Sequence, residues 1–264
     1  MSNANANACI CAIAKNEDLY LDEWITYHLA LGFKHIFLYD NHDTPTLERI
    51  LRSRGYTPTV LTVTHWPGQA AQYPAYNHFI KQATAKQFKW VSFHDIDEFI
   101  VLVQHRDITS FLNEYCPSGA ISMNWLMFGT SDHKHYTPLP VTQRFQKCDT
   151  QPDQHVKTIS VIEDIEHITN AHYVYLKPGK KQRDTTGKEF FGPWNKDGPL
   201  DIARINHYWC KSEGEHAQRY GKLTGDGLTK HVKLEDRPTN NDIFNSSAWD
   251  FYKAHLPKPK PTLL

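Results

Sequence analysis

The sequence has little of what marks a membrane-spanning, exported or nucleic-acid-coating protein. Within its 264 residues, no apolar run approaches the ~18 residues that a transmembrane helix needs. The N-terminus lacks the basic segment of a signal peptide, so we do not expect export. The 29 Lys and Arg residues balance 29 Asp and Glu residues, which disfavours a general polyanion binder. We therefore expect a protein that is cytoplasmic or peripheral to a membrane, with no transmembrane segment and no nucleic-acid partner.

Cysteine is also scarce, and several common enzyme motifs are missing. The five cysteines include no C-x-x-C pair, so neither a zinc site nor a thioredoxin motif is indicated. Reduced thiols at all five positions suit a reducing cytosol. No G-x-x-x-x-G-K-[ST] loop, no G-x-G-x-x-G turn after the first strand, no H-E-x-x-H and no G-x-S-x-G occurs. P-loop hydrolases, Rossmann dehydrogenases, zincins and α/β-hydrolases are therefore disfavoured.

The first half of the chain alternates segments typical of strands and helices. Short apolar runs predict buried strands, and apolar residues at helical spacing predict the helices between them. The predicted strands are residues 8–14, 35–39, 58–63 and 90–94, and the predicted helices are residues 21–29, 46–54 and 74–86. This order implies parallel strands with helices on both faces. We expect an α/β fold with a mixed, mostly parallel central sheet flanked by helices.

The second half of the chain is less regular. It predicts strands at residues 120–125, 141–147, 156–163, 173–176 and 202–209, and a loop at 179–198. Ser212, with Glu215 three residues on, forms a capping box that predicts a helix over 212–223. Since no linker is visible, we expect one domain over residues 8–245. A disordered N-terminus at 1–7 precedes it, and a C-terminal helix with a Pro/Lys tail at 246–264 follows.

Acidic residues follow the fourth predicted strand as Asp95-Ile96-Asp97. Residues two apart in extended chain share a face, so both carboxylates can meet one ligand. Proteins hold Mg²⁺ or Mn²⁺ with one or two carboxylates plus substrate phosphates. We interpret Asp95 and Asp97 as metal ligands, with a contact to water or a ribose hydroxyl open to one of them. A solvated turn is the alternative.

Polar clusters also follow the first two predicted strands, as Lys15-Asn16-Glu17 and Asp40-Asn41. Ligands of parallel sheets bind outside the carboxyl ends of the strands. We therefore interpret Lys15, Asn16, Glu17 and Asp40 as contacts to a nucleotide. The alternatives are acids in the first turn of a helix and an Asx turn at Asp40.

One later segment combines aromatic, glycine and polar residues. Trp125, Phe128 and Gly129 form a candidate sugar platform, because aromatic faces stack on sugars and glycine lets a backbone approach a ligand. Core packing is the alternative. Asp132 and His133, which follow directly, are candidates for a general base.

Further candidates are a late histidine and three lysines. His207, at the end of a predicted strand, is a candidate metal ligand, with a structural histidine as the alternative. Lys157, Lys211 and Lys222 are candidates to neutralise a diphosphate leaving group, although each alone is more often a solvated surface lysine.

Five segments occur together in a recognisable order. They are AIAKNEDLYLDEWITYHLALGFKHIFLYDN, WVSFHDIDEFIVL, NWLMFGTSDH, HVKTISV and INHYWCKSEGEHAQRYGKL. Together they resemble GT-A-fold glycosyltransferases of the family-2 and family-92 kind, over roughly residues 8 to 224.

The resemblance implies an enzyme that transfers a sugar, usually with inversion, from a nucleotide diphosphate sugar to a glycan or lipid-linked saccharide hydroxyl. It implies Mn²⁺ or Mg²⁺ held by Asp95 and Asp97, with His207 as a further ligand. The metal would act as a Lewis acid for the departing diphosphate. The resemblance does not identify the base that takes the acceptor proton; Asp132 is our first choice and His133 the second. The implied nucleotide pocket contains Lys15, Asn16, Glu17 and Asp40.

Two other functions remain open at this point. A metal-dependent nucleotidyl- or phosphotransferase would use the same acids but release inorganic phosphate or pyrophosphate. A catalytically inactive carbohydrate-binding domain would bind sugar without nucleotide or metal, and the polar clusters at three strand ends argue against it.

Overall fold

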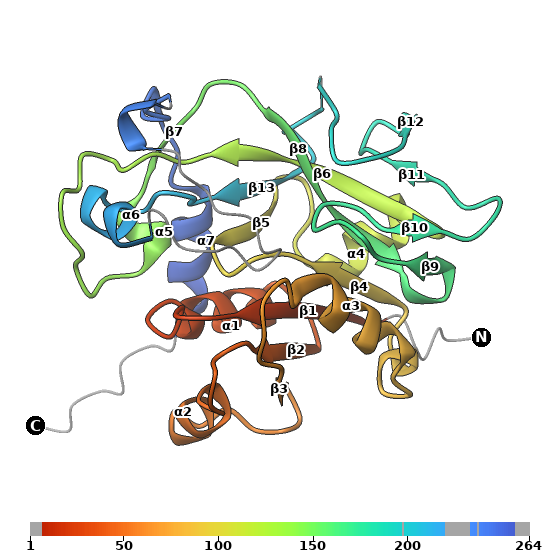
Figure 1. Ribbon diagram of the computed structural model, residues 1–264. Helices are drawn as coiled ribbons and strands as arrows, with labels where there is room; N and C mark the ends of the chain where they lie inside the picture. The colour runs from red at the N-terminus through yellow and green to blue at the C-terminus, as the bar shows by residue number, and fades with distance from the viewer. Residues whose placement is uncertain (1–6, 197, 220–232, 237, 257–264) are drawn as a thin grey trace, which may run out of the picture.

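A central mixed sheet runs through the molecule, with helices on both of its faces (Figure 1). The computed structural model describes residues 7–196, 198–219, 233–236 and 238–256. The predicted segments 1–6, 220–223 and 257–264, and with them Lys222, lie outside these residues.

The first half forms a parallel block of four strands. The strand order is β4-β1-β2-β3, as right-handed βαβ connections produce. The strands are β1 (Ala8–Ala14), β2 (His35–Asp40), β3 (Leu61–His65) and β4 (Trp90–Phe93). The connecting helices are α1 (Leu21–Ala30), α2 (Leu47–Ser53) and α3 (Gln72–Lys81), with a 3₁₀ turn η1 (Ala85–Gln87).

The second half extends the same sheet. The antiparallel strand β8 (Asp153–Val161) lies between β4 and β6 (Ala120–Met127). Strand β13 (Ala203–His207) pairs with β6 in parallel and with β5 (Glu98–Leu102) antiparallel. Two antiparallel steps restore the direction of a strand, so β6 and β13 run the same way as β1 and β4. The carboxyl ends of β1, β2, β4, β6 and β13 therefore share one edge of the sheet.

Shorter elements surround this sheet. The helices are α4 (Ile108–Tyr115), α5 (Val141–Arg144), α6 (Glu213–Arg219) and α7 (Ser247–His255), with 3₁₀ turns η2 (Ile162–Asp164) and η3 (Leu234–Asp236). The small strands are β7 (Lys147–Cys148), β9 (Ile165–His167), β10 (Tyr175–Leu176), β11 (Gln182–Arg183), β12 (Glu189–Phe190) and β14 (Ile243–Phe244).

The core has two parts, one on each face of the sheet. Strand β1 shows why: Ile10 and Ala12 point into the cluster packed by α1, α2 and α4, while Cys9 and Cys11 point into the cluster packed by α3 and η1. All five cysteines are buried and free, which agrees with the expectation of reduced thiols.

The structure differs from the predicted elements in the second half. Residues 141–147 were expected to be a strand, but Val141–Arg144 is the helical turn α5. The cause is distant in sequence, because the carboxylate of Glu23 on α1 accepts the amide hydrogens of Val141 and Thr142 at the start of α5. The predicted loop at 179–198 contains the antiparallel pair β11 and β12.

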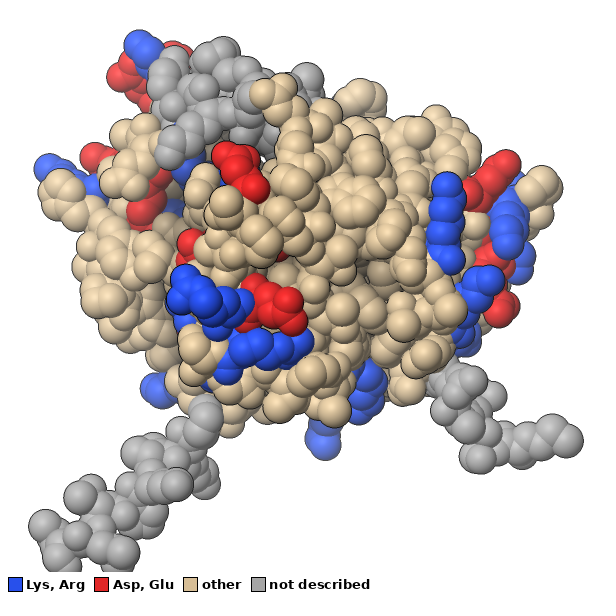
Figure 2. Space-filling model, turned by 60° about the horizontal axis from the view of Figure 1, so that its bottom comes forward, with Lys and Arg blue, Asp and Glu red and all other residues tan. Residues whose placement is uncertain are grey.

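Charged residues are spread in mixed groups over the face seen in Figure 2, where Lys and Arg lie beside Asp and Glu and much of the surface is uncharged. Within the described residues, no helix has the length and hydrophobicity to cross a bilayer.

Candidate active site

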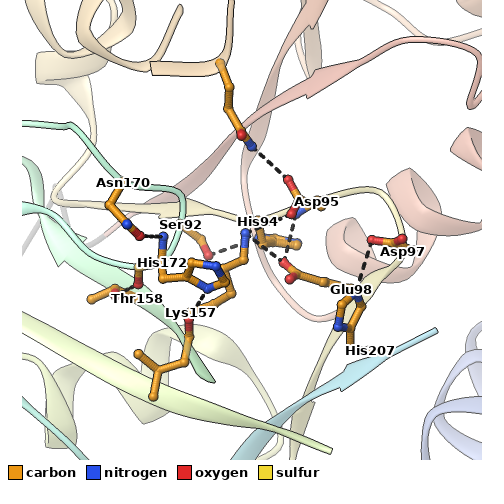
Figure 3. A network of polar contacts seen from close by, with 12 residues as sticks. Ser92, His94, Asp95, Asp97, Glu98, Lys157, Thr158, Asn170, His172 and His207 are labelled. Atoms are coloured by element: carbon orange, nitrogen blue, oxygen red, sulfur yellow. Dashed lines mark hydrogen bonds and ion pairs between the residues drawn. The ribbon is translucent and has the colours of Figure 1, made fainter. Parts of the chain in front are cut away.

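The candidate site lies at the sheet edge where the carboxyl ends of the strands meet (Figure 3). After β4 the chain makes a tight turn through Asp95 and Asp97 into β5. The turn is closed by two hydrogen bonds: the Glu98 amide donates to the Asp95 carbonyl at 3.1 Å, and the Asp95 amide donates to Glu98 Oε2 at 2.9 Å. Glu98 is completely buried, so this turn is anchored in the core.

A buried pair of histidines, His28 and His94, lies next to the turn. His28 Nδ1 lies 2.8 Å from the carbonyl of Trp24, which can only accept, so His28 Nε2 is the acceptor nitrogen of a neutral ring. His94 Nε2 therefore donates to His28 Nε2 at 3.2 Å, and His94 Nδ1 accepts from Ser92 Oγ. Burial lowers the pKa of His28 to about 3, and lowers that of His94 as well. Both rings are therefore neutral, and these hydrogen bonds fix the position of His94, the residue before Asp95.

Asp95 is held by two side chains from different elements. Lys157 on β8 donates to its Oδ2 at 2.9 Å, and Gln72 at the start of α3 donates to its Oδ1 at 2.9 Å. Lys157 is 1% exposed, and its Nζ also lies 3.4 Å from Glu98 Oε2. Burial alone would raise the pKa of Asp95, but the ammonium of Lys157 outweighs it and the net shift is downward. Asp95 is therefore an ionised carboxylate paired with a buried cation.

Asp97 faces two other partners. Its Oδ2 accepts hydrogen bonds from both terminal nitrogens of Arg219 on α6, at 3.1 and 3.2 Å. Its Oδ1 lies 3.7 Å from Nε2 of His207. Burial opposes ionisation of Asp97, but Lys211, Arg219 and His207 together lower its pKa below the ordinary value. The parallel register of β13 with β6 brings His207 to this edge, opposite Glu98 on β5.

A second buried cation lies beside Glu17. Lys211 Nζ lies 3.9 Å from Glu17 Oε2 and 4.3 Å above the ring of Tyr20. Among the described residues, neither Lys211 Nζ nor Glu17 Oε2 has a hydrogen-bond partner. Burial lowers the pKa of Lys211 and raises that of Glu17. Arg219 reaches this pair too, at 3.8 Å from Glu17 Oε1. Buried polar atoms without partners need an explanation, and a bound ion, water or polar ligand is one of them.

The donor set was tested against the predicted metal. Asp97 Oδ1 and His207 Nε2 offer one oxygen and one imidazole nitrogen that face each other across 3.7 Å, and both suit Mn²⁺ or Mg²⁺ chemistry. In the described part of the chain, no group of three His, Cys, Asp or Glu side chains is arranged to hold a metal. The pair therefore fits an ion whose remaining ligands come from substrate oxygens and water. Asp95 is turned toward Lys157 and Gln72 instead.

The other predicted nucleotide contacts form a group around His42. Asp40 is buried at the end of β2, and its oxygens accept from the amides of Thr46 and Leu47 at the start of α2 and from His42. His42 in turn accepts the amide hydrogen of Asn16, which has a left-handed φ of 60°. Asp40 thus orders the loop beside Asn16 rather than presenting a free carboxylate.

Lys15 lies at the outer side of this group. Its Nζ pairs with Asp43 at 2.9 Å, and both side chains are exposed. Lys15 is the predicted nucleotide contact with the least structural restraint.

The predicted sugar platform is divided between core and site. Trp125 lies 4.1 Å, centroid to centroid, from His207, so it borders the site. Phe128 is fully buried and packs on Tyr208 at 4.6 Å, which is the environment of a core residue. A Cβ on Gly129 would lie 2.1 Å from the carbonyl oxygen of Thr239. The absence of a side chain at Gly129 therefore allows the backbone at Thr239 to pack against it.

Asp132 and His133 lie in the loop after β6. Asp132 is largely exposed and forms an ion pair with Lys147 at 2.5 Å. The carbonyl of His133 accepts the amide hydrogen of Glu213 at the start of α6. Arg219, which binds Asp97, ends the same helix, and seven helical residues span about 10 Å. This loop is therefore connected to Asp97 through α6.

Gln72 and Arg219 belong to the site but had no distinguishing signal in the sequence. Gln72 is the first residue of an amphipathic helix, where a polar residue is common and does not indicate a functional site. Arg219 lies two turns after the capping box formed by Ser212 and Glu215, which the structure confirms through the bond from the Glu215 amide to Ser212 Oγ. Only the position of α6 against the Asp97 turn shows that this arginine faces a carboxylate.

Fold and site together define an α/β protein with an acidic turn, buried cations and a histidine at the carboxyl edge of its sheet. The family model for glycosyltransferase family 92 matches residues 5–190, and the chain belongs to this family. His207, Lys211 and Arg219 lie beyond the matched stretch. The mixed α/β class expected from the order of strands and helices is confirmed by the sheet topology.

Similar proteins include two plant members of the same family. A family 92 protein of Oryza sativa subsp. japonica is 26% identical over 177 residues, covering 66% of this chain and 30% of that protein. One of Ricinus communis is 27% identical over 177 residues, covering 65% and 32%. The chain thus matches about a third of the length of these relatives.

Solved structures show only distant similarity. S. aureus TarS 1-349 aligns with a TM-score of 0.39 and 16% identity, over 59% of this chain and 47% of that one. GalNAc-T7, solved with UDP, GalNAc and Mn²⁺, aligns with a TM-score of 0.41 and 8% identity, over 96% and 55%.

Proposed function

We propose that this protein is a glycosyltransferase that moves a sugar from a nucleotide diphosphate sugar to a hydroxyl of a glycan or lipid-linked saccharide. Membership of family 92 supports the reaction class. The observation that carries the assignment to this site is the set of groups around Asp97. Arg219 binds one oxygen, His207 faces the other, and the ammonium of Lys211 is buried close by, where the described residues offer it no hydrogen-bond partner.

The cations suit the diphosphate of the donor. A buried ammonium without a hydrogen-bond partner is costly, and a phosphate oxygen is a ligand that compensates that cost. Lys211 and Arg219 lie on the α6 side of Asp97, where they can neutralise charge on a departing diphosphate. Lys157 is already committed to Asp95 and Glu98, so its part is to hold the acidic turn in place.

Asp97 and His207 would hold Mn²⁺ or Mg²⁺ at this site. When bound, such an ion supplies Lewis-acid assistance to the departure of the diphosphate. Asp97 suits this role because Arg219 occupies only its Oδ2 and leaves Oδ1 directed at His207. Asp95 would complete the site by fixing the turn through Lys157 and Gln72, and by meeting the ribose on its exposed side.

The nucleotide would lie along the ends of β1 and β2. Glu17, Asn16 and Lys15 border this stretch, and Asp40 shapes it through His42. Trp125 would lie under the transferred sugar, beside His207.

The acceptor hydroxyl would attack the anomeric carbon in line with the departing diphosphate, with inversion. Its proton would pass to a base in the loop after β6, with Asp132 as first candidate and His133 as second. Asp132 and its ion-pair partner Lys147 are both exposed to solvent, so an acceptor can approach Asp132.

Nucleotide binding tests the donor site. Purified protein is heated with UDP, GDP, dTDP, ADP or CMP, each with and without Mn²⁺. Binding at a hundredfold excess over the dissociation constant stabilises the folded state by about 2.7 kcal/mol. We expect one nucleotide to raise the melting temperature only with Mn²⁺, and Asp97→Asn to abolish that shift. Asp22→Asn removes an exposed aspartate paired with Arg54 and serves as the matched control. If Asp97→Asn retains the shift, the donor site is not at Asp97.

A further inference from the structure

A line of neighbouring aromatic rings leads from the site to the protein surface. His207, which faces Asp97, lies 4.1 Å from the Trp125 ring. Trp125 stacks on His155 at 5.0 Å with an interplanar angle of 29°, and His155 meets Trp194 edge-on at 6.4 Å. Trp125 is almost fully buried, whereas Trp194 is 59% exposed. A chain of ring contacts therefore links the buried acids to an indole exposed to solvent.

Trp194 is exposed but its backbone is held on both sides. The Val156 amide donates to the carbonyl of Pro193 at 3.0 Å, and the Asn195 amide donates to the carbonyl of Gln154 at 2.7 Å. The Asn195 carbonyl also accepts from the side chain of Asn124. The residues before and after Trp194 are thus bonded to the β6–β8 pair, so the indole is presented on a fixed support. A fixed aromatic side chain loses little entropy when a ligand stacks on it.

A second exposed ring surface lies close by in sequence. Phe191 is 66% exposed and contacts the rings of Tyr173 at 5.0 Å and Tyr175 at 5.4 Å. Two residues separate Phe191 from Trp194, so their Cα atoms are three steps of extended chain apart, at most about 11 Å. Phe191 directly follows β12 and Tyr175 lies on β10, and Figure 1 shows β10 and β12 on the same side of the molecule.

The chemistry of this surface suits a carbohydrate. Sugar rings present apolar C–H faces for stacking and hydroxyls for hydrogen bonds, and aromatic rings here are accompanied by polar groups. The tyrosine hydroxyls of residues 173 and 175 lie 3.4 Å apart at one end, and the Asp153–His155 pair lies beside Trp194 at the other. Two ring surfaces separated by this distance suit several linked sugars better than one.

We infer that Trp194 and the Phe191–Tyr173–Tyr175 cluster bind the acceptor glycan as an oligosaccharide chain and lead its end toward Trp125 and His207. The inference rests on the proposed function, since it assigns the acceptor side of the same site. It predicts that the protein prefers an oligosaccharide of several units over the corresponding monosaccharide.

Substitution of the exposed rings tests this surface. The full chain is applied to a printed array of defined monosaccharides and oligosaccharides, and the dissociation constant is then measured for the best oligosaccharide. We expect that oligosaccharide to bind at least about tenfold more tightly than its monosaccharide, and Trp194→Leu to weaken it about tenfold. Leucine keeps an apolar side chain but removes the ring, so it separates stacking from general hydrophobic contact. Phe191→Ala gives a second, independent variant.

Phe244→Ala is the matched control, because Phe244 is an equally exposed phenylalanine on β14. It should bind the oligosaccharide as the unmodified protein does. Retention of full binding by both Trp194→Leu and Phe191→Ala would overturn the inference. So would the failure of every oligosaccharide to bind the unmodified protein.

The melting-temperature shift with UDP and Mn²⁺, or with whichever nucleotide binds, reports on the donor site in the same variants. Loss of oligosaccharide binding in Trp194→Leu with an unchanged nucleotide shift supports the inference. Absence of any nucleotide shift, with oligosaccharide binding that still depends on Trp194, would refute the proposed transferase while the glycan surface stands.

Discussion

Removal of the buried cation Lys157 tests the electrostatic frame of the site. In Lys157→Met the side chain keeps its length and apolar stem but loses the ammonium that contacts Asp95 Oδ2 at 2.9 Å and Glu98 Oε2 at 3.4 Å. Breaking a buried ion pair on one side costs 3–5 kcal/mol, because the other charge is left without a partner. Asp95 is 39% exposed, so water can partly replace the lost partner. We therefore expect a loss of about 3 kcal/mol in the free energy of unfolding at neutral pH.

The stability that Lys157→Met loses relative to the unmodified protein should depend on pH. In the unmodified protein the pKa of Asp95 lies below 3.8, so its contribution to stability is present above about pH 4 and is lost only as the pH falls further. Without Lys157, burial raises the pKa of Asp95 above its value in the unfolded chain. The variant then regains part of its deficit as the pH falls toward that raised value, because the carboxyl group becomes neutral.

Urea unfolding at several pH values measures both effects. Lys147→Met is the matched control, since it removes the same group from the exposed pair with Asp132 and should cost less than about 1 kcal/mol. If Lys157→Met were as stable as Lys147→Met at neutral pH, the buried pair would not hold the turn, and the reasoning would be refuted.

Two further predictions concern residues around the site. Glu215 is buried against Arg144 at 2.7 Å, and although burial opposes ionisation, bonds from Arg144, Ser212 and Tyr20 lower its pKa to about 2. Its contribution, about 3 kcal/mol, should be present above pH 4.5 and fade as the pH falls toward 2, so Glu215→Gln should differ from the unmodified protein at pH 7 far more than at pH 2.5 in urea unfolding. Gly129→Ala places a Cβ 2.1 Å from the Thr239 carbonyl oxygen and should lower the melting temperature by several degrees, and an unchanged melting temperature would show that the contact is absent in solution.

The parallel half of the fold was predictable because its signals are local. Strand β1 begins and ends at the predicted residues, 8 and 14, and the apolar residues at helical spacing from Leu21 mark α1. Once strands alternate with helices, sheet topology brings the segments after β1, β2 and β4 to one edge. This is why Glu17 and Asp97, which are far apart in sequence, both reach Arg219.

The rest of the site depends on contacts that sequence patterns do not encode. Residues 141–144 have the composition of a strand, yet they turn into a helix because Glu23 binds their amides. We interpreted Asp40 as a nucleotide contact, and its hydrogen bonds show that it also caps α2. An aspartate at the end of a strand does not by itself predict such a cap. Trp194 lies in a segment with weak periodicity, and only the packing of that segment on β8 gives the indole its place beside His155.

The most direct measurement of the central claim is the product released from a nucleotide sugar. The full chain is incubated with Mn²⁺, a panel of nucleotide diphosphate sugars and a mixture of oligosaccharide acceptors, and free nucleotide and phosphate are quantified. We expect release of nucleoside diphosphate from one donor, reduced at least about 100-fold in Asp97→Asn and unchanged in Asp22→Asn. Release of inorganic phosphate or pyrophosphate, or nucleoside diphosphate release that Asp97→Asn leaves intact, would contradict it.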